Sequence, residues 1–152
     1  MTHKNEFSYI KKHLPYQEPF LFVGELRQVT ENGVQGDYTF AKEADFYKGH
    51  FKNHPVTPGV ILTECCAQIG LVCLGIFLLN DQQQKPLQIG FTSAEMEFLK
   101  PVYPGEKVQV VSEKVYFRFQ KLKCKVKMYN QEEELVCKGL LSGMFKATPN
   151  EK

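Results

Sequence analysis

The sequence predicts an α+β fold in which a strongly curved antiparallel sheet wraps around one long, hydrophobic helix. The first observation is a stretch of about 20 residues, 60–79, that is apolar almost throughout. The second is that strand-like segments surround this stretch, two before it and four after it. A helix that is apolar on nearly every face must be covered rather than laid on a surface. We therefore expect residues 1–152 to form a single domain.

The two segments before the helix are typical of a β-hairpin. Residues 19–30 (PFLFVGELRQVT) begin as a continuous apolar run and then alternate, and residues 33–41 (GVQGDYTFA) follow them. Glu31-Asn32-Gly33 lies between the two segments. Asparagine followed by glycine is a hairpin turn signal, because both residues tolerate positive φ. A loop rich in histidine, glycine and proline is expected at 42–58.

The helix is expected to begin beside Thr57 and Pro58 and to end near Leu79. Threonine is a good N-cap, and proline suits the first helical position. The segment is also long enough to cross a bilayer. Against that reading, Glu64 and Gln68 lie inside it, and a carboxylate in hydrocarbon is costly. A buried helix is therefore the better interpretation, and we expect no membrane insertion.

Four strand-like segments follow a polar connector at 80–86, and they span 87–99, 106–119, 121–130 and 134–146. The third of them alternates four lysines (121, 123, 125 and 127) with four apolar residues. Side chains alternate between the two faces of a strand, so the four lysines share one face. That face is either a solvated surface or a docking surface for an acidic carrier protein. Strands in this order around one central helix form the arrangement known as the hot-dog fold.

Composition is that of an ordinary globular protein. A formal net charge of +2 is too close to neutral to suggest a nucleic-acid partner. The five cysteines show neither a CxxC pair nor a metal-finger spacing with the histidines. Free thiols in a reducing, cytoplasmic location are therefore expected. Residues 1–14 are polar and contain no apolar core of a signal peptide.

The candidate site lies between residues 49 and 68. His50 occupies a loop ordered by glycine and proline, and an imidazole can act as a base near neutral pH. Gly59 falls at the expected helix start, where backbone N–H groups lack intrahelical partners and carry partial positive charge. Glu64 lies among apolar helix residues, so we expect it to be buried and its carboxyl group to be a candidate proton donor. Gln68 follows at the i, i+4 spacing and can orient Glu64 or a water molecule.

These groups suit the elimination of water from a 3-hydroxyacyl thioester. The reaction needs a base for the C2 proton, an acid for the departing hydroxyl and a donor at the thioester oxygen. His50, Glu64 and the Gly59 N–H supply them in that order, and no cofactor or metal is required. Each residue alone also has a structural explanation, because loop histidines and early-helix glutamates are common. Their combination on an otherwise apolar helix is what indicates an acid/base site.

The stretch GHFKNHPVTPGVILTECCAQ, residues 49–68, resembles the signature of the (3R)-hydroxyacyl-[acyl carrier protein] dehydratases of fatty-acid synthesis. It shares with them GHF, HPV, PGV, the glutamate and the AQ pair, all in register. The segments LPYQEPFLFVGEL upstream and MEFLKPVYPGEKV downstream also resemble the corresponding parts of that family. The resemblance therefore spans about residues 14–145.

The resemblance implies a hot-dog homodimer, which could assemble further into a trimer of dimers, and a substrate carried by acyl carrier protein. It implies that His50 of one subunit faces Glu64 of the other. It also implies that the Gly59 N–H polarises the thioester, that the Val56 carbonyl orients His50, and that Gln68 assists Glu64.

Three positions depart from the family pattern. Tyr16-Gln17 stands where the family usually has His-Arg, Leu99-Lys100 where it has two basic residues, and Thr57 where it has methionine. These changes spare the acid/base pair but touch the acyl tunnel and the docking of the carrier. They suggest a divergent member that serves a specialised acyl or polyene pathway.

Two other functions stay open at the level of sequence. A hot-dog thioesterase would hydrolyse the same class of substrate, with Glu64 activating water. A non-catalytic acyl-binding subunit would keep the fold without turnover. Acyl chain length, and the choice between acyl carrier protein and coenzyme A, are not determined by the sequence.

Overall fold

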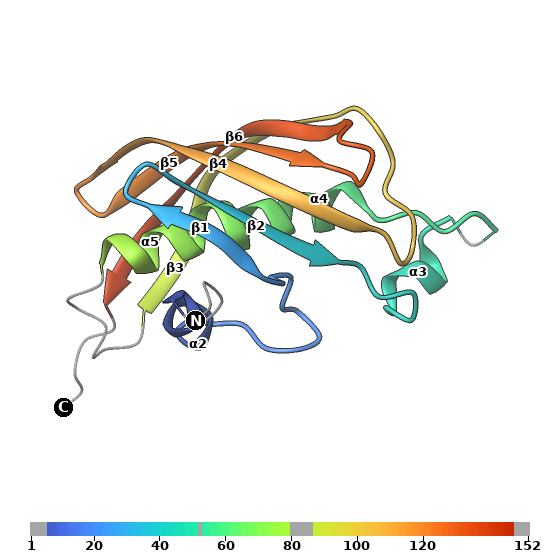
Figure 1. Cartoon of the computed structure of the whole chain (residues 1–152), viewed down its shortest axis with the longest axis horizontal. Helices are drawn as coiled ribbons and strands as arrows, with labels where there is room; N and C mark the ends of the chain where they lie inside the picture. Colours follow the sequence, from blue (N-terminus) through green and yellow to red (C-terminus); the bar gives the residue numbers. More distant parts are fainter. Residues whose placement is uncertain (1–5, 52, 80–86, 148–152) are drawn as a thin grey trace.

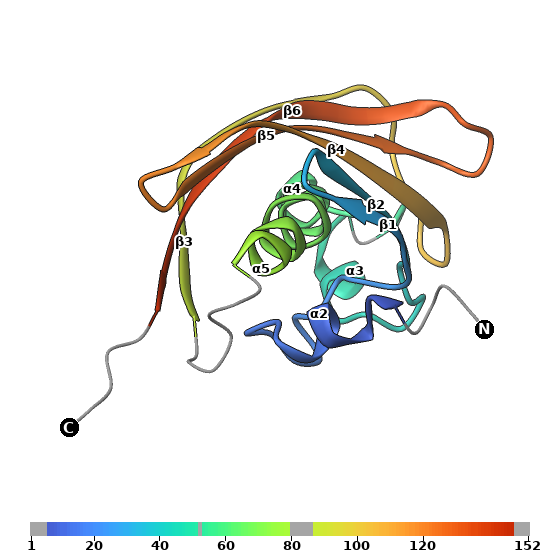
Figure 2. The same ribbon diagram turned by 60° about the vertical axis from the view of Figure 1, so that its left-hand side comes forward.

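The sheet is a single antiparallel layer with strand order β1-β2-β4-β5-β6-β3. The computed structural model describes residues 6–51, 53–79 and 87–147, so the expected connector at 80–86 lies outside the described residues. The strands are β1 (Leu26–Thr30), β2 (Gly33–Thr39), β3 (Leu87–Phe98), β4 (Lys107–Arg118), β5 (Lys121–Tyr129) and β6 (Leu135–Ala147). Figures 1 and 2 show the sheet arching over the central helix. The predicted hot-dog architecture is confirmed.

The central helix has three parts: α4 (Gly59–Ala67), a π-helical turn η1 (Gln68–Val72) and α5 (Cys73–Leu78). Every residue from Cys65 to Ile76 is buried. By length and composition the helix could cross a membrane, yet 72% of its apolar 18-residue window is buried inside the protein. The prediction of a core helix enclosed by the sheet is therefore confirmed. The π turn inside it had no counterpart in the sequence prediction.

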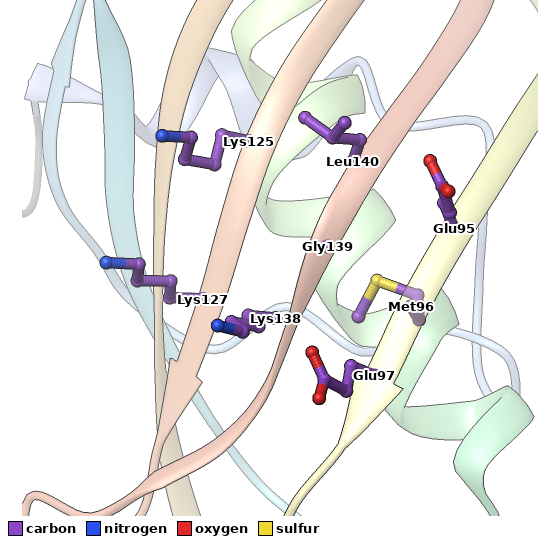
Figure 3. A pocket seen from close by; sticks show the side chains of 8 residues that line it. All are labelled: Glu95, Met96, Glu97, Lys125, Lys127, Lys138, Gly139 and Leu140. Atoms are coloured by element: carbon purple, nitrogen blue, oxygen red, sulfur yellow. The ribbon is translucent and has the colours of Figure 1, made fainter.

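Strand β5 shows how the sheet covers the helix. Its residues Leu122, Cys124, Val126 and Met128 are all fully buried. Lys125 and Lys127, which alternate with them, point to the opposite face (Figure 3). The alternation that the sequence predicted is confirmed. The convex face of the sheet consequently carries a column of ammonium groups.

The predicted first strand was too long at its start. Only Leu26–Thr30 is a strand, and residues 19–25 form an extended loop. The reason is that the backbone of Phe22 bonds to the central helix: its N–H donates to Gln68, and its carbonyl accepts from the Cys65 thiol. Pairing with β2 begins at Gly24, whose N–H donates to the Asp37 carbonyl. The other five strands begin and end within two residues of the predictions.

The predicted helix start was displaced by one residue. Pro58 is the N-cap and Gly59 the first helical residue, and no side chain caps the helix. Thr57 does not cap the helix because its hydroxyl is paired with the hydroxyl of Tyr47 in the core. Tyr47 belongs to a short helix, α3 (Phe46–Gly49), inside the segment expected to be a loop.

A second short helix, α2 (Ser8–Lys12), was not predicted either. It lies beneath the open side of the central helix (Figure 2), and its residue Ile10 is fully buried. The sheet therefore covers one side of the core, and the N-terminal segment covers part of the other.

Strand β3 forms one edge of the sheet and pairs on its other side with β6. Between Gln88 and Phe98 only Ile89 and Met96 are even partly buried. Phe91 and Phe98 are 47% and 49% exposed. A long edge strand with exposed aromatic side chains is a template for pairing with another chain.

Candidate active site

His50 is held by the loop that leads into the central helix. It is the C-cap of α3, and its Nδ1 lies 2.8 Å from the Val56 carbonyl oxygen. A carbonyl oxygen can only accept, so Nδ1 carries a proton, and the tautomer that this bond selects has its lone pair on Nε2. The ring of Phe51 stacks on the imidazole at a centroid distance of 4.2 Å. His50 is therefore oriented as a base whose free nitrogen points away from Val56.

The loop that carries His50 is fixed at two points besides this hydrogen bond. The hydroxyls of Tyr47 and Thr57 bond to each other, and the Thr57 N–H donates to the Val102 carbonyl at 2.8 Å. Tyr47 and Thr57 are both buried. Thr57, which stands where the resembling family has methionine, therefore has a hydrogen-bonding partner for its hydroxyl. This bond connects α3 to the start of α4.

Glu64 and Gln68 form a connected polar pair on the central helix. Gln68 Nε2 donates to Glu64 Oε2 at 3.0 Å and to the Phe20 carbonyl at 3.1 Å. Its Oε1 accepts from the Phe22 N–H at 2.7 Å. Gln68 is fully buried, so these bonds fix the amide, and the amide in turn fixes the Glu64 carboxylate. Glu64 itself was expected to be buried and is only partly buried in the single chain.

Gly59 lies at the first turn of α4, where backbone N–H groups have no intrahelical acceptor. A Cβ atom at this position would come within 3.2 Å of the Phe98 ring, so glycine allows β3 to pack closely against the helix start. Gly59, Leu62 and Phe98 contribute to a surface pocket of about 300 Å³. A group entering this pocket reaches a helix N-terminus, which favours negative charge.

A second pocket, of about 180 Å³, opens at Glu64. Its other lining residues include Tyr16 from the N-terminal loop and Ile89 and Phe91 from β3. His50 is not among the residues that line it. The single chain therefore brings Glu64 together with Gln68, and His50 together with Val56.

Sequence reasoning did not identify Tyr16, Tyr47 or Phe98 as site residues. Only Tyr16 carried a usable signal, because it stands where the resembling family has a different residue type. The contacts of the other two depend on the packing of α3 and β3 against the helix start, which no local pattern encodes.

The cysteines beside Glu64 do not behave as nucleophiles. All five cysteines are free and buried. Burial, followed by the effects of Cys137 and Glu64, raises the pKa of the Cys65 thiol well above its usual value. A thiol in that state stays protonated near neutral pH, and the thiolate is the reactive form.

Comparison with known proteins identifies the family of the chain. The FabA-like domain family matches residues 14–141. The 3-hydroxyacyl-[acyl-carrier-protein] dehydratase FabZ of Acinetobacter baumannii is 36% identical over 108 residues, which cover 70% of this chain and 73% of that enzyme. The protein of the same name from Syntrophobacter fumaroxidans is 29% identical over 143 residues, covering 94% of this chain and 95% of that one.

Solved structures share the fold at low sequence identity. A chain of the dehydratase heterocomplex ApeI:P from Xenorhabdus doucetiae superposes with a TM-score of 0.74 at 12% identity, covering 93% of this chain and 91% of that chain. A hypothetical thioesterase from Streptococcus pneumoniae, solved with coenzyme A, superposes with a TM-score of 0.59 at 15% identity, covering 96% and 98%. Fold likeness alone does not separate dehydratases from thioesterases. The sequence match does, and the chain belongs to the FabA-like family of 3-hydroxyacyl-[acyl-carrier-protein] dehydratases.

Proposed function

We propose that this protein removes water from (3R)-3-hydroxyacyl-[acyl carrier protein] to give the trans-2-enoyl thioester, in fatty-acid or related acyl or polyene biosynthesis. The observation that carries the proposal is the hydrogen bond between His50 Nδ1 and the Val56 carbonyl. This bond leaves Nε2 as an oriented base. A dehydration needs such a base, whereas a histidine with only a structural role does not have to present one. Because this chemistry uses a soluble carrier, we place the protein in the cytoplasm.

The proposed reaction moves one proton at each of two positions. His50 Nε2 takes the C2 proton, and the electron pair left on C2 forms the C2–C3 double bond as the C3–O bond breaks. Glu64 gives its proton to the departing hydroxyl, which leaves as water. The Gly59 N–H donates to the thioester oxygen, where negative charge develops. Each turnover shifts a proton from Glu64 to His50, and exchange with solvent restores both groups.

The active unit in this proposal is a homodimer. Strand β3 leaves one edge unpaired and exposes Phe91 and Phe98, so two copies can join β3 to β3 about a two-fold axis. Ile89 and Phe91 of the same strand line the pocket at Glu64, so an interface at β3 borders that pocket. The His50 half of a partner could then complete the Glu64 half of the first chain, giving two equivalent sites. Further assembly into a trimer of dimers is compatible with this contact.

The convex face of the sheet supplies a docking surface for the acidic carrier. A groove of about 520 Å³ is lined by Lys125, Lys127, Lys138, Glu95 and Glu97, among others (Figure 3). Lys127 and Lys138 lie directly opposite each other on β5 and β6. Within the described residues neither lysine forms an ion pair with a carboxylate. Like charges in that position destabilise a sheet. Glu97, which lies opposite Lys138 on β3, offsets part of that cost, and an anionic partner would offset more of it.

The direct test of function is product analysis. The purified protein is incubated with 3-hydroxyacyl-[acyl carrier protein] of several chain lengths, and the enoyl thioester is measured. Release of free thiol in place of enoyl product would identify a thioesterase. Tight binding of the acyl carrier with no turnover would identify a non-catalytic subunit.

The composite site is tested by mixing subunits. The His50→Ala and Glu64→Ala homodimers should both be nearly inactive, whereas a mixed dimer regains one intact site and recovers activity. Mixed dimers that have demonstrably exchanged subunits and stay inactive would place the pair within one chain.

The docking surface is tested by charge reversal. The double variant Lys127→Glu/Lys138→Glu should raise KM for the carrier-bound substrate and leave turnover of a short pantetheine thioester unchanged. Lys11→Glu/Lys12→Glu on the exposed face of α2 makes the same change in net charge elsewhere and is the control. If the two double variants raise KM equally, the convex face is not the docking surface for the carrier.

A further inference from the structure

The pocket at Glu64 contains a second polar group. Among the described residues that line it, Tyr16 is the only one apart from Glu64 with a polar side chain. The rest of the wall is apolar and is made by Ala67, Leu71, Val72, Ile89 and Phe91. A substrate group that meets the Glu64 carboxyl in this pocket therefore has one other side-chain hydrogen-bonding partner within reach, the Tyr16 hydroxyl.

Tyr16 is held in place by the segment that Gln68 anchors. Its ring contacts the ring of Phe20 at a centroid distance of 6.3 Å, and the Phe20 ring packs edge-on against Phe22 at 5.0 Å. Gln68 bonds the Phe20 carbonyl and the Phe22 N–H. The same amide orients Glu64. One buried side chain thus sets the positions of both polar groups of the pocket.

The Tyr16 hydroxyl is a donor throughout the physiological range. Burial, together with the nearby Glu64 carboxylate and Cys73, raises the pKa of Tyr16 to about 12. The phenol therefore keeps its proton. It can donate a hydrogen bond to an oxygen that Glu64 is about to protonate, and it does not compete as a proton source.

We propose that Tyr16 is a further catalytic residue: its O–H donates a hydrogen bond to the 3-hydroxyl oxygen of the substrate and holds that leaving group against Glu64. The inference rests on the proposed dehydration and names a group that the acid/base pair does not include. During the reaction the Glu64 proton passes to the hydroxyl, the C3–O bond breaks and water departs. Tyr16 keeps its own proton and stabilises the oxygen as it leaves.

The test compares two leaving groups in the same active site. Pantetheine thioesters of a 3-hydroxyacyl and of a 3-chloroacyl chain are given to the wild type and to Tyr16→Phe. Chloride leaves as an anion and needs neither a proton nor a hydrogen bond from the phenol, whereas both reactions need His50 as the base. Phenylalanine keeps the ring and its contact with Phe20.

Tyr16→Phe should lower kcat for loss of water by about five- to tenfold, the value of one hydrogen bond. It should leave the loss of chloride within about twofold of wild type. Tyr38→Phe is the matched control, because Tyr38 is also a partly buried tyrosine with a pKa raised to about 12 by burial. Tyr38 lies outside the pocket, and its variant should match wild type in both reactions.

The outcomes separate the two proposals. If the wild type dehydrates the substrate and Tyr16→Phe does so at an unimpaired rate, the role of Tyr16 is overturned and the dehydration stands. An equal loss of both reactions in Tyr16→Phe also overturns that role, because that result indicates a structural residue. A wild-type protein that forms no enoyl product from the hydroxy substrate overturns the dehydration, and the role of Tyr16 with it.

Discussion

Replacing Gln68 with leucine should destabilise the protein and disable Glu64 at the same time. Leucine fills a similar volume, so a cavity contributes little, and the loss comes from three hydrogen bonds. Phe22 is only 3% exposed, so its N–H would lose its partner without access to water, at a cost of about 1–3 kcal/mol. The Phe20 carbonyl belongs to a residue that is 47% exposed and can bond to water. We therefore expect a total loss of roughly 2–3 kcal/mol, mostly from Phe22.

For a chain of this length 1 kcal/mol corresponds to roughly 2–4 °C, so the midpoint of thermal unfolding should fall by about 5–10 °C. Calorimetry at fixed protein concentration measures this. Gln28→Leu on β1 is the control: Gln28 is exposed, and its variant should stay within about 0.5 kcal/mol of wild type. A Gln68→Leu protein as stable as the control variant would refute the reasoning, because the amide would then not be holding the Phe20–Phe22 segment.

Three further results are expected. His50→Asn should fold normally and lose roughly 10²- to 10⁴-fold in dehydration rate, the usual contribution of a general base; a folded variant with near-normal turnover would exclude the assignment. Phe91→Arg on β3 should shift the protein from dimer to monomer in analytical ultracentrifugation, and unchanged sedimentation would show that the dimer forms elsewhere. Burial raises the pKa of the Cys73 and Cys124 thiols from 9.0 to about 12, so above pH 9 the unfolded chain gives up protons that the folded chain keeps. The free energy of unfolding should therefore fall as pH rises from about 9 to 12, and denaturant titrations that show stability constant or rising over this range would contradict the burial of these thiols.

The parts of the fold that follow from local patterns were predicted well. The alternation along Lys121–Met128 requires one buried and one exposed face, and the hairpin turn at Asn32-Gly33 requires residues that accept tight-turn geometry. The apolar helix was recognisable because Glu64 and Gln68 are its only strongly polar side chains, and the same contrast marked them as site residues.

What the sequence could not predict depends on contacts between distant segments. The run at Phe20–Val23 has the composition of a strand, but a glutamine 46 positions away from Phe22 takes its N–H. Thr57 is a residue type favoured at N-caps, but its hydroxyl is hydrogen-bonded to the hydroxyl of Tyr47. In both cases a side chain brought in by the tertiary fold replaced the local partner that the pattern implied.

The π-helical turn at Gln68–Val72 sets the rotational phase between the two halves of the central helix. Each residue of an α-helix turns the following side chains by about 100°, and a π turn accommodates one residue more than regular helix. Deleting one residue from this turn would restore regular α-helix and leave Glu64 in the same rotational phase relative to the buried face of α5. Deleting one residue from the regular helix between Glu64 and the turn would rotate Glu64 by about 100° relative to that face. Across the descendants of this gene, a change of one residue in the length of the helix should therefore be tolerated at the π turn and not in the regular helix beside it.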